Sequence, residues 1–233
     1  MNISPTQDGE FAAAIRRTVE RCKPKYVIET GTCTGEGTTR ILFESLYSLG
    51  EAHDWTLVTI EVARKLFMKA AARYERTPEV VCLHGLSIPE ELLPTREQVK
   101  ALVIDEQIPG IYYDHDPNVR VDMYLSEQAS EGPDALLRVA CAAFECKPDL
   151  VLLDSAGHLG FIEFEYLMSL VKGTFVLIVD DRMHVKHHRT WKQIQHSSGW
   201  EIIEQGPERF GWGIARCLSL GRVLYPETQF IGP

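Results

Sequence analysis

The length, composition and charge of the chain limit the class of protein it can be. Its 233 residues can bury a full core, and 45% hydrophobic and 24% charged residues are typical of a globular protein. A formal net charge of −9 argues against a nucleic-acid partner. The chain has no run of about eighteen apolar residues, so we expect no membrane span.

The N-terminus and the cysteines indicate the compartment. Residues 1–10 are polar and acidic, without the basic start and apolar core of a signal peptide. The six cysteines are scattered and form no C-x-x-C pair, which argues against a zinc knuckle or a redox motif. We therefore expect free thiols and a cytoplasmic protein.

Strands alternate with helices along most of the chain. This alternation predicts βαβ units and a mostly parallel sheet, which the last two strands close as an antiparallel hairpin. Helices are expected over 11–22, 38–49, 64–74, 134–146, 161–171 and 187–197, and strands over 26–29, 55–60, 80–83, 150–153, 174–179, 200–204 and 213–218.

The first strand runs into a loop of small residues, Glu29-Thr-Gly31-Thr32-Cys33-Thr-Gly35, and then into a helix. Strand, glycine loop and helix is the arrangement that binds the phosphate or sugar end of a nucleotide-like cofactor. Gly31 and Gly35 carry no Cβ, so their backbone can approach a ligand closely. A tight strand-to-helix turn without a ligand is the alternative.

The stretch from 89 to 132 interrupts the alternation. A short helix is expected within 90–102, and 108–118 is rich in Pro, Gly, Tyr and Asp, which indicates an irregular loop. We interpret this insertion into a single domain as a lid or substrate wall, with a plain surface loop as the alternative.

Acidic residues stand after four of the parallel strands: Glu29, Glu61, Asp154 and the pair Asp180-Asp181. With the closing hairpin, this order resembles the class I S-adenosylmethionine (SAM)-dependent methyltransferases over residues 25–218. The loop from Glu29 looks like that family's acid-x-Gly-x-Gly-x-Gly motif, with Cys33 in place of the middle glycine. The resemblance implies a Rossmann-like, doubly wound, mostly parallel seven-stranded α/β sheet.

The resemblance also implies a cofactor site. Glu61 would accept hydrogen bonds from the two ribose hydroxyls, and Glu29 would orient the loop or approach the methionine amino group. Gly85 to Ser87 lie where the family places adenine contacts. The residues expected to bind SAM are Glu29, Gly31, Thr32, Cys33, Gly35, Thr38, Glu61, Gly85, Ser87 and Asp154.

Within the family, the resemblance is closest to metal-dependent small-molecule O-methyltransferases of the catechol O-methyltransferase-like and antibiotic-tailoring kinds. Asp154, Asp180 and Asp181 match their metal positions, and converging carboxylates favour a hard cation such as Mg²⁺. Mn²⁺ or Fe²⁺ fits if a histidine joins the ligands. A helix cap is the alternative role for Asp180 or Asp181.

The proton acceptor is open at this stage. The catechol enzymes have a lysine three residues after the first Asp, where this chain has Gly157 followed by His158. His158 or His184 is expected to act as base or extra ligand beside Asp154, because a neutral imidazole accepts a proton near pH 7.

Other polar and aromatic residues have two interpretations each. Arg182 and Lys186 would bind an acidic group of the substrate, or are surface charges. Tyr112, Tyr113 and Trp212 would wall an aromatic or sugar substrate, or fix loops to the core.

The sequence thus predicts a SAM-dependent methyltransferase that acts on a hydroxyl of a small molecule with help from a divalent metal. An NAD(P)-dependent oxidoreductase and a non-catalytic cofactor-binding module are the alternatives. About thirty residues separate the glycine loop from Glu61, more than the ~20 usual in dinucleotide folds, and this spacing disfavours the oxidoreductase. A homodimer is a possible assembly.

Overall fold

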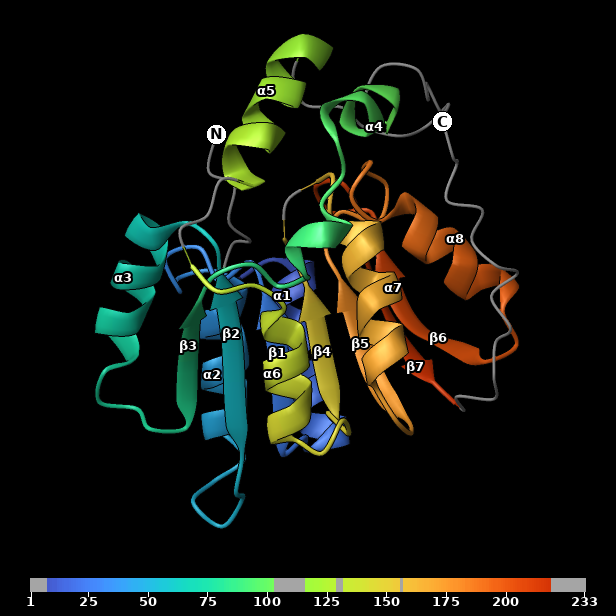
Figure 1. The fold of residues 1–233 in the computed structure, drawn as a ribbon. Helices are drawn as coiled ribbons and strands as arrows, with labels where there is room; N and C mark the ends of the chain where they lie inside the picture. The colour runs from blue at the N-terminus through green and yellow to red at the C-terminus, as the bar shows by residue number, and fades with distance from the viewer. Residues whose placement is uncertain (1–7, 103–115, 129–131, 156, 219–233) are drawn as a thin grey trace.

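One seven-stranded sheet organises the part of the chain that the structure describes (Figure 1). The computed structural model describes residues 8–102, 116–128, 132–155 and 157–218. The strands lie in the order β3-β2-β1-β4-β5-β7-β6. Strands β1 to β5 are parallel, and β7 runs antiparallel to its neighbours β5 and β6. Their bounds are β1 (Tyr26–Thr30), β2 (Thr56–Glu61), β3 (Val80–His84), β4 (Leu150–Leu153), β5 (Phe175–Val179), β6 (Trp200–Gly206) and β7 (Trp212–Cys217).

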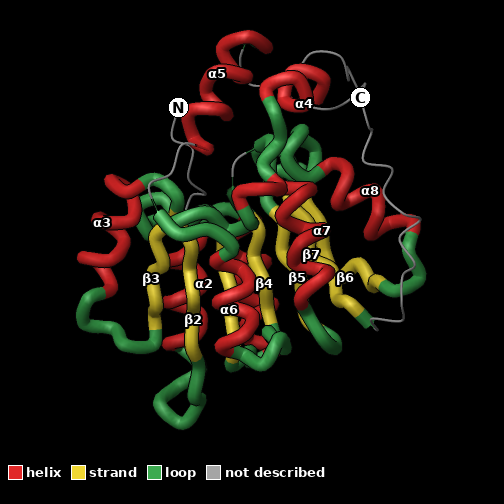
Figure 2. The backbone as a smooth tube through the Cα atoms, in the orientation of Figure 1, coloured by secondary structure: helices red, strands yellow, loops and turns green. Residues whose placement is uncertain are grey.

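Helices cover both faces of the sheet (Figure 2). The α-helices are α1 (Glu10–Cys22), α2 (Thr38–Tyr47), α3 (Arg64–Tyr74), α4 (Arg96–Lys100), α5 (Pro117–Gln128), α6 (Leu136–Ala143), α7 (Gly160–Leu170) and α8 (His188–His196), and η1 (Glu90–Leu92) is a 3₁₀ turn. Neighbouring strand residues point to opposite faces, so Val27 packs in the core under α1 and α2, and Ile28 in the core under α6 and α7. No helix within the described ranges is long and apolar enough to cross a membrane.

The predicted fold class is confirmed. The described residues form a mostly parallel sheet with the expected C-terminal antiparallel hairpin. The helix over 64–74 and the strand over 150–153 lie where the sequence predicts them, and most other elements differ only in a few terminal residues. Apolar runs thus predict where an element lies better than they predict where it begins and ends, because helix ends fray and depend on caps.

The insertion is more regular than predicted. The expected helix within 90–102 is split into η1 and α4, because Leu93, which precedes Pro94, is extended. Thr95 then begins α4 with a capping box to Gln98. The loop predicted to run to residue 118 ends earlier, since α5 begins at Pro117, and proline suits the first helical position. Residues 103–115 lie outside the described ranges.

The two insertion helices pack together beyond one end of the sheet (Figure 1). Val99 of α4 and Val121 and Tyr124 of α5 form a small apolar cluster of their own. The Tyr124 ring also stacks on His158, which follows β4, with ring centroids 4.6 Å apart. The insertion therefore contacts the loop at the carboxyl end of β4.

Replacement of Gly31 tests how closely the glycine loop packs on the end of β4. Gly31 has a φ of +82°, and a Cβ there would lie 2.1 Å from the Asp154 carbonyl oxygen. We expect Gly31→Ala to lower the free energy of unfolding by at least about 3 kcal/mol, because backbone strain and a backbone clash add. Chemical denaturation measures this change.

Gly173→Ala is the matched control for that substitution. Gly173 has a φ of +99°, but nothing lies within 4 Å of the Cβ position. We expect it to cost only the strain of the left-handed conformation, about 1 kcal/mol. Equal effects of the two substitutions would contradict the close approach of Gly31 to Asp154.

Candidate active site at the carboxyl edge of the sheet

A cavity of about 340 Å³ opens where the strand order reverses, between β1 and β4. Open α/β sheets bind ligands at this point, outside the carboxyl ends of the strands. Loops from β1, β2, β3, β4 and β5 and the β6–β7 turn all contribute to its wall. The lining residues are Thr30, Gly31, Thr32, Cys33, Gly37, Thr38, Ile60, Glu61, Val62, Ala63, Leu66, Gly85, Leu86, Ser87, Asp154, Ser155, Leu159, Asp181, Lys186 and Arg209.

Most residues predicted to bind the cofactor line this one cavity. Glu29 and Gly35 are the exceptions. Gly35 instead packs against Tyr74, whose hydroxyl donates a hydrogen bond to the Gly35 carbonyl oxygen at 2.7 Å. The others lie in the wall: Gly31, Thr32, Cys33, Thr38, Glu61, Gly85, Ser87 and Asp154.

Glu61 joins the end of β2 to the glycine loop. One of its carboxylate oxygens accepts a hydrogen bond from the Cys33 backbone N–H at 2.7 Å, and the other accepts one from the Ala63 N–H at 2.8 Å. Burial raises the pKa of Glu61, and these two donors counteract the rise. The cavity wall therefore holds a carboxylate in a fixed orientation.

Glu29 lies behind the wall and has no exposed surface. Its carboxylate accepts hydrogen bonds from the hydroxyls of Thr38 and Thr39 at 2.6 Å each and of Thr59 at 2.7 Å. These contacts tie β1 to β2 and to the first turn of α2. Of the two roles predicted for Glu29, this geometry supports orientation of the loop.

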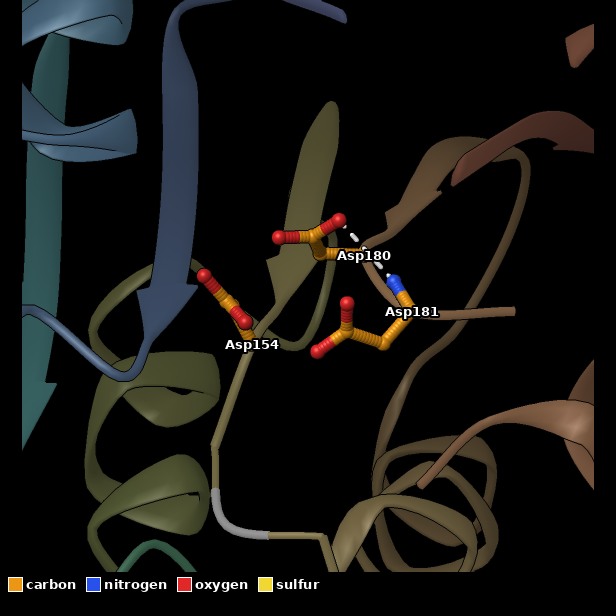
Figure 3. Close-up of side chains that lie close together, drawn as sticks. All are labelled: Asp154, Asp180 and Asp181. Carbon is orange, nitrogen blue, oxygen red and sulfur yellow. Dashed lines mark hydrogen bonds between the residues drawn. The ribbon is translucent and has the colours of Figure 1, made fainter. Parts of the chain in front are cut away.

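Three aspartates converge at the ends of β4 and β5 (Figure 3). One carboxylate oxygen from each of Asp154, Asp180 and Asp181 lies within 4.8 Å of the others. Asp181 has a φ of 59°, a left-handed conformation that aspartate tolerates and that redirects the chain after β5. Burial and the two neighbouring carboxylates raise the pKa of Asp180 to about 8.

Two cations of the chain already contact this acidic cluster. The Lys186 ammonium lies 2.5 Å from Asp154 Oδ1 and 2.7 Å from Asp181 Oδ2. Arg209 binds Asp180 Oδ2 at 3.0 Å. A divalent metal held by Asp154 and Asp181 would lie close to this ammonium, whose positive charge opposes the binding of a second cation.

The two histidines predicted as bases lie outside the cavity wall. Both are nearly inaccessible, and burial lowers the pKa of His158 to about 3. His184 Nδ1 accepts a hydrogen bond from the Lys186 backbone N–H at 3.3 Å, so it shapes the turn that carries the lysine. Asp154 is thus the predicted catalytic residue that lines the cavity.

Sequence reasoning missed Arg209 and Glu163 and did not predict the contacts of Lys186. Lys186 was expected at the surface or on a substrate, yet it is only 6% exposed and pairs with the chain's own carboxylates. Arg209 lies in a turn with no motif around it. Glu163 of α7 is fully buried and accepts hydrogen bonds from the hydroxyls of Thr30 at 2.9 Å and Ser155 at 2.7 Å. A glutamate inside an expected helix gave no signal of such burial.

The aromatic wall predicted from the sequence is partly corrected. Trp212 is 1% exposed and stacks on Phe11 of α1, with ring centroids 5.7 Å apart, so it belongs to the core. Trp212 is the first residue of β7, and its large ring is buried in the core instead of lying in a loop. Tyr112 and Tyr113 lie outside the described residues.

Comparison with known proteins places this fold among methyltransferases. No protein-family model and no curated protein matches the sequence. An O-methyltransferase from Bacillus cereus, solved in complex with S-adenosylhomocysteine (SAH), aligns with a TM-score of 0.52 and 18% identity, over 94% of this chain and 83% of that one. An O-methyltransferase from Streptomyces achromogenes involved in tomaymycin synthesis, in complex with SAM, aligns with a TM-score of 0.50 and 14% identity, over 89% of this chain and 79% of that one. An SAH-bound methyltransferase from Podospora anserina aligns with a TM-score of 0.51 and 10% identity, over 88% of this chain and 76% of that one. At these identities the likeness is one of fold.

The ionisation of Glu29 gives a prediction about pH. Burial raises its pKa from 4.5 to about 7, so the folded chain holds a proton that the unfolded chain releases in this range. The contribution of Glu29 to stability is therefore largest at acidic pH and is lost as the pH rises from about 4.5 to 7. We expect this loss to reach about 3 kcal/mol.

Denaturation of the wild type and of Glu29→Gln between pH 5 and 8 measures this contribution. The glutamine is neutral throughout, so the difference in stability between the two proteins should change with pH. Glu44→Gln, at an exposed site on α2, is the control and should follow the wild type. Parallel curves for the wild type and Glu29→Gln would show that Glu29 does not take up this proton.

Proposed function

We propose that the chain is a SAM-dependent methyltransferase that methylates a hydroxyl group of a small molecule. The observation that carries this proposal is the cavity at the switch point, where the glycine loop, Glu61 and Asp154 all meet. The fold shared with SAM- and SAH-bound O-methyltransferases supports it. The titratable groups around the cavity are consistent with proton removal from a hydroxyl.

The cofactor half of the cavity lies along β1, β2 and β3. The fixed carboxylate of Glu61 would accept hydrogen bonds from ribose hydroxyls, and the backbone at Gly31 to Cys33 would contact the methionine end. Leu66 and Leu86 add apolar wall where an adenine ring would lie beside Ser87. SAM supplies a methyl group activated by its positive sulfur, so the chain has mainly to bind and orient it.

The acceptor half lies at Asp154, Asp181 and Lys186. The acceptor oxygen forms a bond to the methyl carbon while the carbon–sulfur bond breaks and the sulfur keeps the electron pair. We assign the hydroxyl proton to Asp154, which lines the cavity with its side chain 18% exposed. Burial raises the pKa of this carboxyl, which makes it a better proton acceptor than an aspartate in water.

The divalent metal predicted from the sequence remains a prediction. Its proposed ligands, Asp154, Asp180 and Asp181, do come together, but the Lys186 ammonium lies among them and opposes a second cation. We also retain the proposal that the insertion is a lid or wall, since Tyr124 of α5 packs over His158 beside the acceptor half. A small hydroxyl compound as partner and a homodimer as assembly are part of the same proposal.

Titration calorimetry with SAH tests the cofactor assignment first. We expect micromolar binding to the wild type, and a loss of affinity of about ten- to a hundredfold in Glu61→Gln, because a charged hydrogen-bond acceptor is removed. Glu36→Gln is the control, since Glu36 lies in the same loop but outside this cavity and should bind normally. Stabilisation by NAD and not by SAH would instead favour an oxidoreductase.

Methyl transfer from labelled SAM to phenols, sugars and hydroxy acids tests the reaction. With an acceptor found in this way, we expect Asp154→Asn to lower kcat by about 10²- to 10⁴-fold, because the asparagine cannot take the proton. Asp149→Asn is the control, since Asp149 lies at the start of β4, away from the cavity. Binding of SAH without transfer to any acceptor, and with no change in Asp154→Asn, would favour a non-catalytic binding module.

A further inference from the structure

We propose that the Lys186 ammonium occupies the place in the acidic cluster that a divalent metal would otherwise take. The site then works without a metal ion. The catalytic part of this inference rests on the proposed methyl transfer. The part about the cation stands on the geometry of the cluster alone.

The position of the ammonium supports this role. Lys186 Nζ lies between carboxylates from two adjacent strands, 2.5 Å from Asp154 and 2.7 Å from Asp181. A cation shared by Asp154 and Asp181 has to lie within reach of both groups, and the lysine nitrogen does so. Lys186 also lines the cavity, so its charge faces the acceptor half.

The lysine is built into the fold and does not reach in from the surface. Its side chain is 7% exposed and crosses the start of α7 at Gly160. A Cβ at Gly160 would lie 2.7 Å from Lys186 Cγ and 2.4 Å from the Lys186 carbonyl oxygen. The turn from Asp181 to His187 is closed by its own hydrogen bonds, which include the Lys186 N–H to His184 Nδ1. The backbone of this turn therefore holds Lys186 beside the acidic cluster.

The charges of the cluster are almost balanced without an added ion. Lys186 and Arg209 face the carboxylates of Asp154, Asp180 and Asp181, which leaves at most one net negative charge. A divalent ion beside both cations would make the cluster net positive, which opposes its binding.

The ammonium can supply part of what a metal would supply. It stabilises negative charge that develops on the acceptor oxygen, and it holds Asp154 in place to receive the proton. Lys186 forms ion pairs with two carboxylates, so it is an electrostatic and positioning group and Asp154 is the base.

Binding of MnCl₂, followed by electron paramagnetic resonance, tests the inference without SAM or an acceptor. We expect the wild type to bind Mn²⁺ no more tightly than about 1 mM, the weak end of carboxylate cation sites. Lys186→Met removes the positive charge from the cluster. This variant should bind Mn²⁺ at least about tenfold more tightly, with a rise in Tm on adding the metal. If Lys186→Met does not fold, Lys186→Gln, a neutral hydrogen-bond donor, takes its place.

Lys172→Met is the control, because Lys172 is exposed on the turn after α7 and should behave as the wild type. In a second arm, EDTA should leave the SAH affinity and any methyl transfer of the wild type unchanged. Tight Mn²⁺ binding by the wild type, or loss of its activity in EDTA, would overturn the inference. So would failure of both Lys186 variants to gain Mn²⁺ binding. A chain that binds neither Mn²⁺ nor SAH, but gains Mn²⁺ binding in Lys186→Met, would lose only the methyltransferase proposal.

Discussion

The pairing of buried and half-buried carboxylates and cations at the ends of β4 and β5 is the constraint on which the rest of the site depends. Like charges placed together away from water cost several kcal/mol each unless opposite charges and hydrogen bonds compensate them. Lys186 and Arg209 supply that compensation from two different loops. Two backbone hydrogen bonds between residues 182–183 and 210–211 join the same loops, so charge and backbone fix this side of the cavity together.

On the other side of the cavity, neutral donors satisfy a buried acid. Three threonine hydroxyls donate hydrogen bonds to Glu29, which therefore stabilises the glycine loop from within the core. The glycines serve the same packing, since the Gly31 backbone approaches the Asp154 carbonyl too closely for any side chain. The features that resemble a ligand-binding motif thus also have a structural role, in which they hold β1 against β2 and β4.

Carboxylates, an ammonium and a guanidinium, with no imidazole among the described residues of the wall, give the cavity its chemical character. His158 is held under Tyr124 of the insertion, and the lowered pKa keeps its ring neutral. This contact therefore joins α5 to the loop after β4. His184 similarly supports the turn that carries Lys186. Among the described residues, His158 thus contacts Tyr124 and His184 contacts the turn of Lys186, while neither lines the cavity.

The sequence by itself determined the order of elements and the convergence of Glu61, Asp154, Asp180 and Asp181 at one edge, because apolar runs reveal strands and parallel strands end on the same side. The tertiary structure decided the partners of those acids. Lys186 lies in a turn whose path depends on the left-handed Asp181 and on space at the start of α7. Neither condition is local in sequence, so a buried ion pair between β4 and β5 could not be distinguished from a metal site or a surface lysine until the chain was folded.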